Sequence, residues 1–244
     1  GNHIVNGDIG CYEQGGYGLF SKAIQSTDEG EKSYRITSPY ELLDTIYVMG
    51  SGIGMAQGQA QAGYEKKGKV FAVAGDSTFF HAALPAVVNA AYNDANITFL
   101  VLDNRWTAMT GHQPSPTTGV DAVGDKNKVL DIEASARALG IDFVKRASAF
   151  DLKQAEAAIR EGAEHEGPAV VILDGECALQ VQRRQGNLRP LVVVEEDCTG
   201  CKNCVALGCP AITYDVATRK AGIDGNQCAS CVLCQQTCPT GAIR

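Results

Sequence analysis

The sequence lacks the features of a membrane protein or a nucleic-acid-binding protein. No apolar run approaches the roughly 20 residues that a helix needs to cross a bilayer, so we expect no membrane partner. Acidic residues outnumber basic ones, giving a net charge of −7, which argues against nucleic acid because that partner is attracted by basic patches. No segment reads as a secretory signal peptide. We therefore expect a cytoplasmic protein.

Cysteine, in contrast, is abundant, with ten among 244 residues. Without a secretory segment these thiols are expected to stay reduced and to bind metal rather than form disulfides. Eight of them lie near the C-terminus in two sets that are thirty positions apart. The sets are Cys198, Cys201, Cys204 and Cys209, and Cys228, Cys231, Cys234 and Cys238.

Each set follows the run C-x2-C-x2-C-xn-C-P, which holds two [4Fe–4S] clusters in two-cluster ferredoxins. Three closely spaced thiolates bind one cube, and the cysteine before the proline binds the other cube. Zinc sites more often pair two C-x2-C units across a longer gap. The first set has four residues before its last cysteine, where three are usual, which leaves the number of ligands unchanged. The predicted ligand sets are Cys198, Cys201, Cys204 and Cys238 for one cluster, and Cys228, Cys231, Cys234 and Cys209 for the other.

The rest of the chain predicts an α/β domain. Residues 69–74, 97–102 and 169–173 are continuous apolar runs of the kind found in buried parallel strands, and helical segments alternate with them. We expect a parallel sheet flanked by helices over residues 1–182, a polar linker over 183–190, and a small α+β two-cluster ferredoxin domain over 191–244. Close helix packing explains Gly52, Gly54 and Gly58 better than a dinucleotide loop does, since the downstream acidic residue of such a loop is missing.

Polar residues follow two of the predicted strands. Asp76 and Asn104 are 28 positions apart, about one β–α–β unit, so neighbouring strands would bring them to one edge of the sheet, where ligands of α/β proteins bind. Carboxylate and amide oxygens suit Mg²⁺, which completes its octahedron with water and phosphate. Gly75 lets backbone amides approach a diphosphate. The alternative is a helix-capping aspartate and a turn asparagine.

These motifs resemble those of the 2-oxoacid:ferredoxin oxidoreductases. Gly75-Asp76-Ser77 followed by Asp103-Asn104 is similar to the thiamine diphosphate motif G-D-G…N-N, with serine for its last glycine and aspartate for its first asparagine. Residues 7–12, 75–81 and 107–114, together with the cysteine-rich tail, extend the resemblance over nearly the whole chain.

The resemblance implies roles for individual residues. Asp76, Asn104 and the main-chain oxygen of Trp106 would bind Mg²⁺, and the diphosphate would lie against Gly75, Ser77, Thr110 and Gly111. Members of the family often hold a further [4Fe–4S] cluster beside the thiamine. Cys11 and Cys177 match two of its four ligands; the alternative is two inert thiols.

The resemblance also implies a missing part. Thiamine enzymes bind the cofactor between a diphosphate-binding and a pyrimidine-binding domain, and only the first is recognisable in this sequence. A missing segment or a partner chain would supply the second domain with its glutamate, and a second oxidoreductase subunit is expected.

The expected activity is oxidative decarboxylation of a 2-oxoacid. Thiamine chemistry would release CO₂, coenzyme A would take the acyl group, and electrons would pass through the clusters to a soluble ferredoxin. The resemblance favours an arylpyruvate such as indolepyruvate as substrate. His81 could face the substrate carboxylate or shuttle a proton, or could be a helix-terminal histidine bonded to the backbone. Two alternatives are a non-oxidative thiamine decarboxylase and an electron-transfer subunit with a vestigial thiamine fold.

Overall fold

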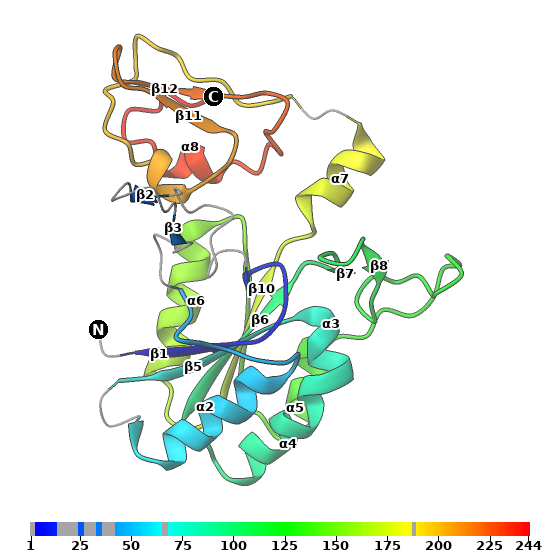
Figure 1. Ribbon diagram of the computed structural model, residues 1–244. Coiled ribbons are helices and arrows are strands. Elements are labelled where there is room, and N and C mark those ends of the chain that lie inside the picture. The colour runs from blue at the N-terminus through cyan, green and yellow to red at the C-terminus, as the bar shows by residue number, and fades with distance from the viewer. Residues whose placement is uncertain (1–2, 14–23, 27–32, 36–41, 65–67, 187–188) are drawn as a thin grey trace. The chain divides into compact units, whose positions relative to one another are not determined.

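The computed structural model describes residues 3–13, 24–26, 33–35, 42–64, 68–186 and 189–244 (Figure 1). The chain forms two units, residues 1–149 with 153–176, and residues 150–152 with 177–244. Helix α7, Ala178–Gln185, belongs to the second unit and runs across the start of the predicted linker. The boundaries at residues 182 and 191 that the sequence suggested stay predictions.

The first unit is built on a sheet of six parallel strands in the order β4-β1-β5-β6-β10-β9 (Figure 1). This arrangement confirms the predicted α/β fold with a parallel sheet. The strands are β1 Ile4–Gly7, β4 Thr45–Ile46, β5 Val70–Gly75, β6 Ile97–Asp103, β9 Phe143–Ser148 and β10 Ala169–Asp174.

Helices cover both faces of the sheet, which is consistent with the nearly continuous apolar runs of its central strands β5, β6 and β10. The helices are α2 Ser51–Gln61, α3 Asp76–Thr78, α4 Leu84–Tyr92, α5 Ile132–Ala138 and α6 Leu152–Glu164. In β10, Val170 and Ile172 pack into the core with α2, α4 and α5, whereas Val171 packs on the other face with Ala158 of α6. Figure 1 shows α6 on the side of the sheet opposite to α2 and α4.

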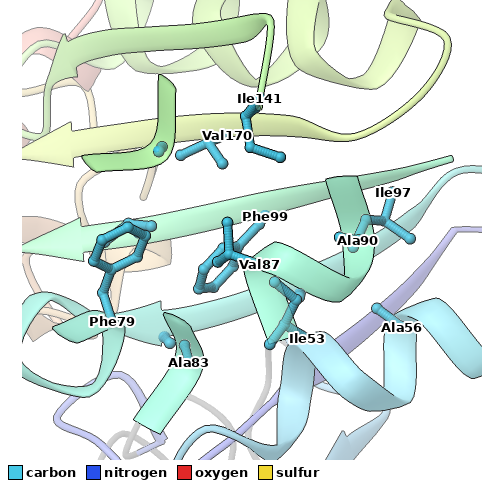
Figure 2. Close-up of a cluster of buried hydrophobic side chains, with 14 of the residues drawn as sticks. Ile53, Ala56, Phe79, Ala83, Val87, Ala90, Ile97, Phe99, Ile141 and Val170 are labelled. Carbon is cyan, nitrogen blue, oxygen red and sulfur yellow. The ribbon is translucent and has the colours of Figure 1, made fainter. Parts of the chain in front are cut away.

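The larger core joins the first helices to the central strands. Phe79 is fully buried and stacks on Phe99 of β6, with ring centroids 6.2 Å apart. Ile53 of α2 and Val87 of α4 belong to the same buried cluster (Figure 2). This packing fixes the start of the segment that follows β5, where the polar residues of interest lie.

The segment after β5 contains a π-helix, η2 Phe79–Ala83, between α3 and α4. The residue pattern over 80–93 is helical in character and gives no sign of this π-helical turn. Pro85 lies in the first turn of α4 and has no N–H to donate to the preceding turn, which separates the π-helical turn from the α-helix after it. Single π-turns are frequent at functional sites.

The glycines of α2 differ in their surroundings. A Cβ on Gly52 would lie 2.8 Å from the carbonyl oxygen of Asn6, so this glycine allows α2 to approach β1 closely. Nothing lies within 4 Å of such an atom on Gly54 or Gly58. The expectation of close packing is confirmed for the first glycine and wrong for the other two, which sit on the exposed side of the helix.

Two short hairpins complete the described part of this unit. Strands β2 Ile24–Ser26 and β3 Ser33–Arg35 pair antiparallel, and so do β7 Trp106–Thr107 and β8 Gln113–Pro114. The second hairpin lies in the segment after β6, which carries several predicted site residues.

The second unit is small and centred on its cysteines. It contains α7, the 3₁₀ turn η3 Val205–Leu207, the antiparallel pair β11 Ile212–Asp215 and β12 Lys220–Ile223, and α8 Leu233–Thr237. Its core includes Cys204 and Cys234 together with Ala221 and Ile243. This is the small α+β domain expected from the sequence. Among the described residues, no helix has the length and apolar character needed to span a membrane.

Candidate functional site

The register of the central strands determines the candidate thiamine site. Gly75 at the end of β5 pairs with Leu102 of β6, so the residues that follow the two strands emerge side by side at the carboxyl edge of the sheet. Asp76 begins α3 directly after β5, and Asn104 follows β6 directly. This is the edge at which ligands of parallel α/β sheets bind.

A cavity of about 330 Å³ opens at this edge. A Cβ on Gly75 would point into open space, so the backbone is accessible there, as close approach of a diphosphate requires. Gly111, the other predicted diphosphate glycine, does not line the cavity. Its φ of +118° is one that glycine adopts readily. The predicted site residues that line the cavity are Gly75, Asp76, Ser77, His81, Asn104, Trp106, Thr110 and Cys11.

The Asp76 carboxylate is buried and held by two hydroxyl groups. Its Oδ2 atom accepts a hydrogen bond of 2.8 Å from Ser115 Oγ and a short one from Thr117 Oγ1. Burial raises the pKa of Asp76, and the bonds from Thr117 and Ser115 act in the opposite direction. Sequence reasoning missed both hydroxyl residues, because they lie about forty positions along the chain from Asp76.

The turn after β6 presents further oxygen atoms. Asn104 Oδ1 accepts a hydrogen bond of 3.0 Å from the backbone N–H of Trp106, and the Trp106 indole N–H donates to Glu176 Oε1 at 3.1 Å. The Arg105 carbonyl between them accepts a short hydrogen bond from Thr118. The turn is thereby fixed, and its residues Asn104 and Trp106 line the cavity.

Asp103 adds a second buried carboxylate next to the site. Its Oδ2 accepts from Arg146 at 3.2 Å, whereas its Oδ1 is buried without a hydrogen-bond partner among the described residues. Burial raises the pKa of Asp103, and repulsion from Asp76 and Asp174 raises it further. The buried Asp76 carboxylate has no ion-pair partner among the described residues and is repelled by Asp103. A divalent cation would stabilise both charges, so the residues fit Mg²⁺.

Another acidic group supports the cavity from the first strand. Asp8 follows β1 and is fully buried, and its Oδ2 accepts from the backbone N–H of Gly50 at 2.5 Å while its Oδ1 accepts a short bond from the Tyr12 hydroxyl. Burial raises the pKa of Asp8, and the Tyr12 and Gly50 bonds and nearby His81 lower it. His81 Nε2 lies 3.4 Å from Ser77 Oγ. The sequence did not identify Asp8 as part of the site.

In the second unit, the two predicted ligand sets surround separate cavities. One cavity is lined by Cys198, Cys201, Cys204 and Cys238. The other is lined by Cys209, Cys228, Cys231 and Cys234. Among the described residues, no two cysteines form a disulfide. In the described part of the chain, no three His, Cys, Asp or Glu side chains converge closely enough to hold a single metal ion.

The thirty-residue duplication also appears in the backbone. Gly200 and Ser230 have φ values of +69° and +55°, and Lys202 and Val232 have values of +68° and +59°. A β-branched residue such as Val232 seldom adopts this conformation, which persists only where the surrounding structure imposes it. Both loops therefore wind in the same way around their cysteines, as two cluster-binding loops of one design would.

The thiols influence one another in the pattern expected of shared clusters. Burial, followed by repulsion from Cys231, Cys209 and Cys228, raises the pKa of Cys234 to about 11. Burial also raises the pKa of Cys204, with Cys201 and Cys198 contributing. Four crowded thiols would be stabilised as thiolates by iron, so their chemistry fits [4Fe–4S] clusters.

The two remaining cysteines, Cys11 and Cys177, line neither of these two cavities. Cys11 is exposed and lies on the wall of the thiamine-site cavity. Cys177 is half-buried and precedes α7 in the other unit. A third cluster bound by both of them stays a prediction.

Comparison with known proteins agrees with this geometry. Residues 25–173 match the family described as "Thiamine pyrophosphate enzyme, C-terminal TPP binding domain", and residues 190–240 match "4Fe-4S dicluster domain". Among curated proteins, the chain is 42% identical over 238 residues to "Indolepyruvate oxidoreductase subunit IorA" of Pyrococcus horikoshii. It is 35% identical over 248 residues to the subunit of the same name from Archaeoglobus fulgidus.

These alignments cover 91% and 100% of this chain but only 36% of each relative. The chain thus spans about a third of the length of the curated relatives it matches. Among solved structures, "2-oxoglutarate:ferredoxin oxidoreductase from Magnetococcus marinus with 2-oxoglutarate, coenzyme A and succinyl-CoA bound" aligns with a TM-score of 0.57 and 20% identity, covering 72% of this chain and 55% of that one. This similarity supports the fold.

Proposed function

Because this chain belongs to the thiamine pyrophosphate enzymes through their C-terminal TPP-binding domain, and is a close homologue of IorA subunits, we propose that it is the cofactor-binding part of a 2-oxoacid:ferredoxin oxidoreductase. The proposed reaction is oxidative decarboxylation of a 2-oxoacid to an acyl-CoA and CO₂. Two electrons leave through [4Fe–4S] clusters to ferredoxin. The names of the relatives favour an arylpyruvate such as indolepyruvate.

One observation carries this proposal: a single chain combines a cavity at the edge of a parallel sheet, lined by the buried Asp76 and by Asn104, with two sets of four cysteines. A non-oxidative decarboxylase would use the first feature and leave the second without a role. A plain electron-transfer subunit would use the cysteines and leave the buried Asp76 carboxylate without a counter-ion.

Different residues of the cavity, together with neighbouring Gly111, would bind the metal and the diphosphate. Asp76, Asn104 and the Trp106 carbonyl oxygen would hold Mg²⁺, and Gly75, Ser77 and the segment at Thr110 and Gly111 would hold the diphosphate. Bound thiamine diphosphate supplies the carbanion chemistry that cleaves the bond next to the keto group. His81 lines the same cavity and would orient the substrate carboxylate or carry a proton.

The proposed reaction also needs groups that are not recognisable in this sequence. The glutamate that thiamine enzymes use to activate the cofactor would come from a pyrimidine-binding domain in another segment or chain, and a second oxidoreductase subunit would complete the enzyme. A thiamine-proximal cluster at Cys11 and Cys177 would need ligands from outside this sequence. Coenzyme A would be a co-substrate.

The test is an assay of the full-length protein with its companion subunit under anaerobic conditions. Acyl-CoA and CO₂ should form only when thiamine diphosphate, Mg²⁺, coenzyme A and oxidised ferredoxin are all present. Indolepyruvate should be turned over faster than pyruvate. Formation of an aldehyde without coenzyme A or ferredoxin would instead identify a non-oxidative decarboxylase.

A further inference from the structure

Two hydroxyl groups bind the same oxygen of the buried Asp76 carboxylate. Ser115 Oγ donates to Oδ2 at 2.8 Å, and Thr117 Oγ1 makes a short hydrogen bond to it. The two hydroxyls lie 2.8 Å from each other, and their residues are only 7% and 5% exposed. A carboxylate oxygen has about two lone-pair sites, so the two hydroxyls use those of Oδ2, and a metal would bind through Oδ1.

The same loop also holds the other half of the site. Thr118 Oγ1 donates a short hydrogen bond to the Arg105 carbonyl and accepts one of 2.8 Å from the Ser115 backbone N–H. Arg105 lies between Asn104 and Trp106, which would give the amide and main-chain oxygens of the site. One loop of four residues therefore contacts both elements that carry the proposed metal ligands.

The loop is itself anchored. The Thr118 N–H donates to the Ser115 carbonyl at 2.9 Å, and the Leu130 N–H donates to the Pro116 carbonyl at 2.9 Å. Its hydroxyl groups are thus held in position before any ligand is present, and they do not have to be ordered by it. Groups that orient metal ligands in this way commonly change metal affinity by about 10–100-fold when they are removed.

We propose that Ser115, Thr117 and Thr118 form a hydroxyl clamp that positions Asp76 and the turn at Asn104–Trp106 relative to each other, so that Mg²⁺ meets a prearranged set of oxygens. This inference rests on the proposed function, because it takes the metal site from there. Ser115 and Thr117 are positioning residues, since they act through Asp76 and not on the substrate.

The test measures binding of Mg²⁺ to the full-length protein, stripped of metal, at saturating thiamine diphosphate by calorimetry. Thr117→Val keeps the shape of the side chain and removes the donor, and Ser115→Ala removes the other donor. Each should raise the Mg²⁺ dissociation constant about 10-fold, and the double variant should raise it towards about 100-fold. Thr117→Ser should restore wild-type affinity, because the hydroxyl returns.

Thr98→Val is the matched control. This residue is fully buried in β6 and donates 2.7 Å to the Gly162 carbonyl, so the substitution removes a comparable hydrogen bond away from the site. Its affinity for Mg²⁺ should equal that of the wild type. If the single and double clamp variants also bind Mg²⁺ within twofold of the wild type, the clamp does not exist. If Thr117→Val fails to fold, Ser115→Ala decides by the same criterion.

Asp76→Asn separates this inference from the function beneath it. Loss of Mg²⁺ binding in Asp76→Asn with normal binding in the clamp variants would overturn only the clamp. Normal Mg²⁺ and thiamine diphosphate binding in Asp76→Asn would overturn the proposed metal site, and with it the clamp.

Discussion

The Tyr12 hydroxyl is hydrogen-bonded to Asp8, which is fully buried. It donates to Asp8 Oδ1 and accepts a hydrogen bond of 2.8 Å from the Asp8 backbone N–H. Tyr12→Phe keeps the ring and removes these bonds together with the 3.0 Å contact of the hydroxyl with the Val73 carbonyl oxygen, so it should lower the free energy of unfolding by about 1–3 kcal/mol. Tyr92→Phe is the control, because Tyr92 is 88% exposed, and its thermal midpoint should match that of the wild type.

The cost of this substitution should depend on pH. Burial raises the pKa of Asp8 above its ordinary value, and the Tyr12 bond acts against that rise. Between the ordinary and the raised pKa, the folded protein keeps a proton that the unfolded chain has released, so the free energy of unfolding falls as pH increases. Without the phenol the pKa rises further and the fall extends to higher pH. Thermal midpoints should differ more at neutral than at mildly acidic pH, and a constant difference would contradict this account.

Individual residues also mark the limit of what the sequence could predict. Asp76 and Asn104 were recognisable because each directly follows a strand, and neighbouring parallel strands end at one edge. Ser115 and Thr117 lie 39 and 41 positions from Asp76, and Gly50 lies 42 positions from Asp8. Such contacts depend on how long loops fold back, and no periodicity or spacing rule encodes them.

At the level of elements, the start of α2 and its exposed turn should respond to the same substitution in opposite ways. Gly50 precedes the helix with a φ of +82°, and a Cβ there would lie 2.8 Å from Ala82 Cβ. Gly50→Ala should therefore destabilise the protein by about 1–3 kcal/mol. Gly54→Ala meets no neighbouring atom and should stabilise it by about 0.5–1 kcal/mol, since alanine loses less backbone entropy in a helix. Thermal unfolding measures both, and equal signs would refute the assignment.

The two cysteine loops allow a second matched comparison. A Cβ on Gly200 would lie 2.2 Å from the Arg219 carbonyl oxygen, so Gly200→Ala should push the first loop out of place. Val232→Gly relieves an unfavourable φ of +59° in the second loop. We expect iron to fall from about eight to about four atoms per chain in Gly200→Ala and to stay at about eight in Val232→Gly. Iron and protein analysis of the purified full-length variants measures this, and unchanged iron in Gly200→Ala would show that the close approach is dispensable.

For the whole molecule, the sequence predicted the architecture, whereas some details of helix ends were not recognisable in it. Continuous apolar runs indicated a covered parallel sheet, and the duplicated cysteines indicated a second, small domain, because both patterns are local in the sequence. The π-helical turn at Phe79–Ala83 and the extension of α7 into the predicted linker were not recognisable. Both depend on how a helix end packs, and helix ends are weakly specified by local sequence.

The proposed function assigns the two units of the chain to two separable tasks. Asp76→Asn should abolish binding of Mg²⁺ and thiamine diphosphate in the full-length protein while leaving about eight irons that dithionite still reduces. Cys231→Ser should retain that binding and lose about four irons, and it should no longer pass electrons from a 2-oxoacid to ferredoxin. Calorimetry, iron analysis and anaerobic ferredoxin reduction test these outcomes. Wild-type ferredoxin reduction by Cys231→Ser would mean that electrons leave the thiamine site by a route other than these clusters, whereas loss of iron in Asp76→Asn would mean that the two units do not fold independently.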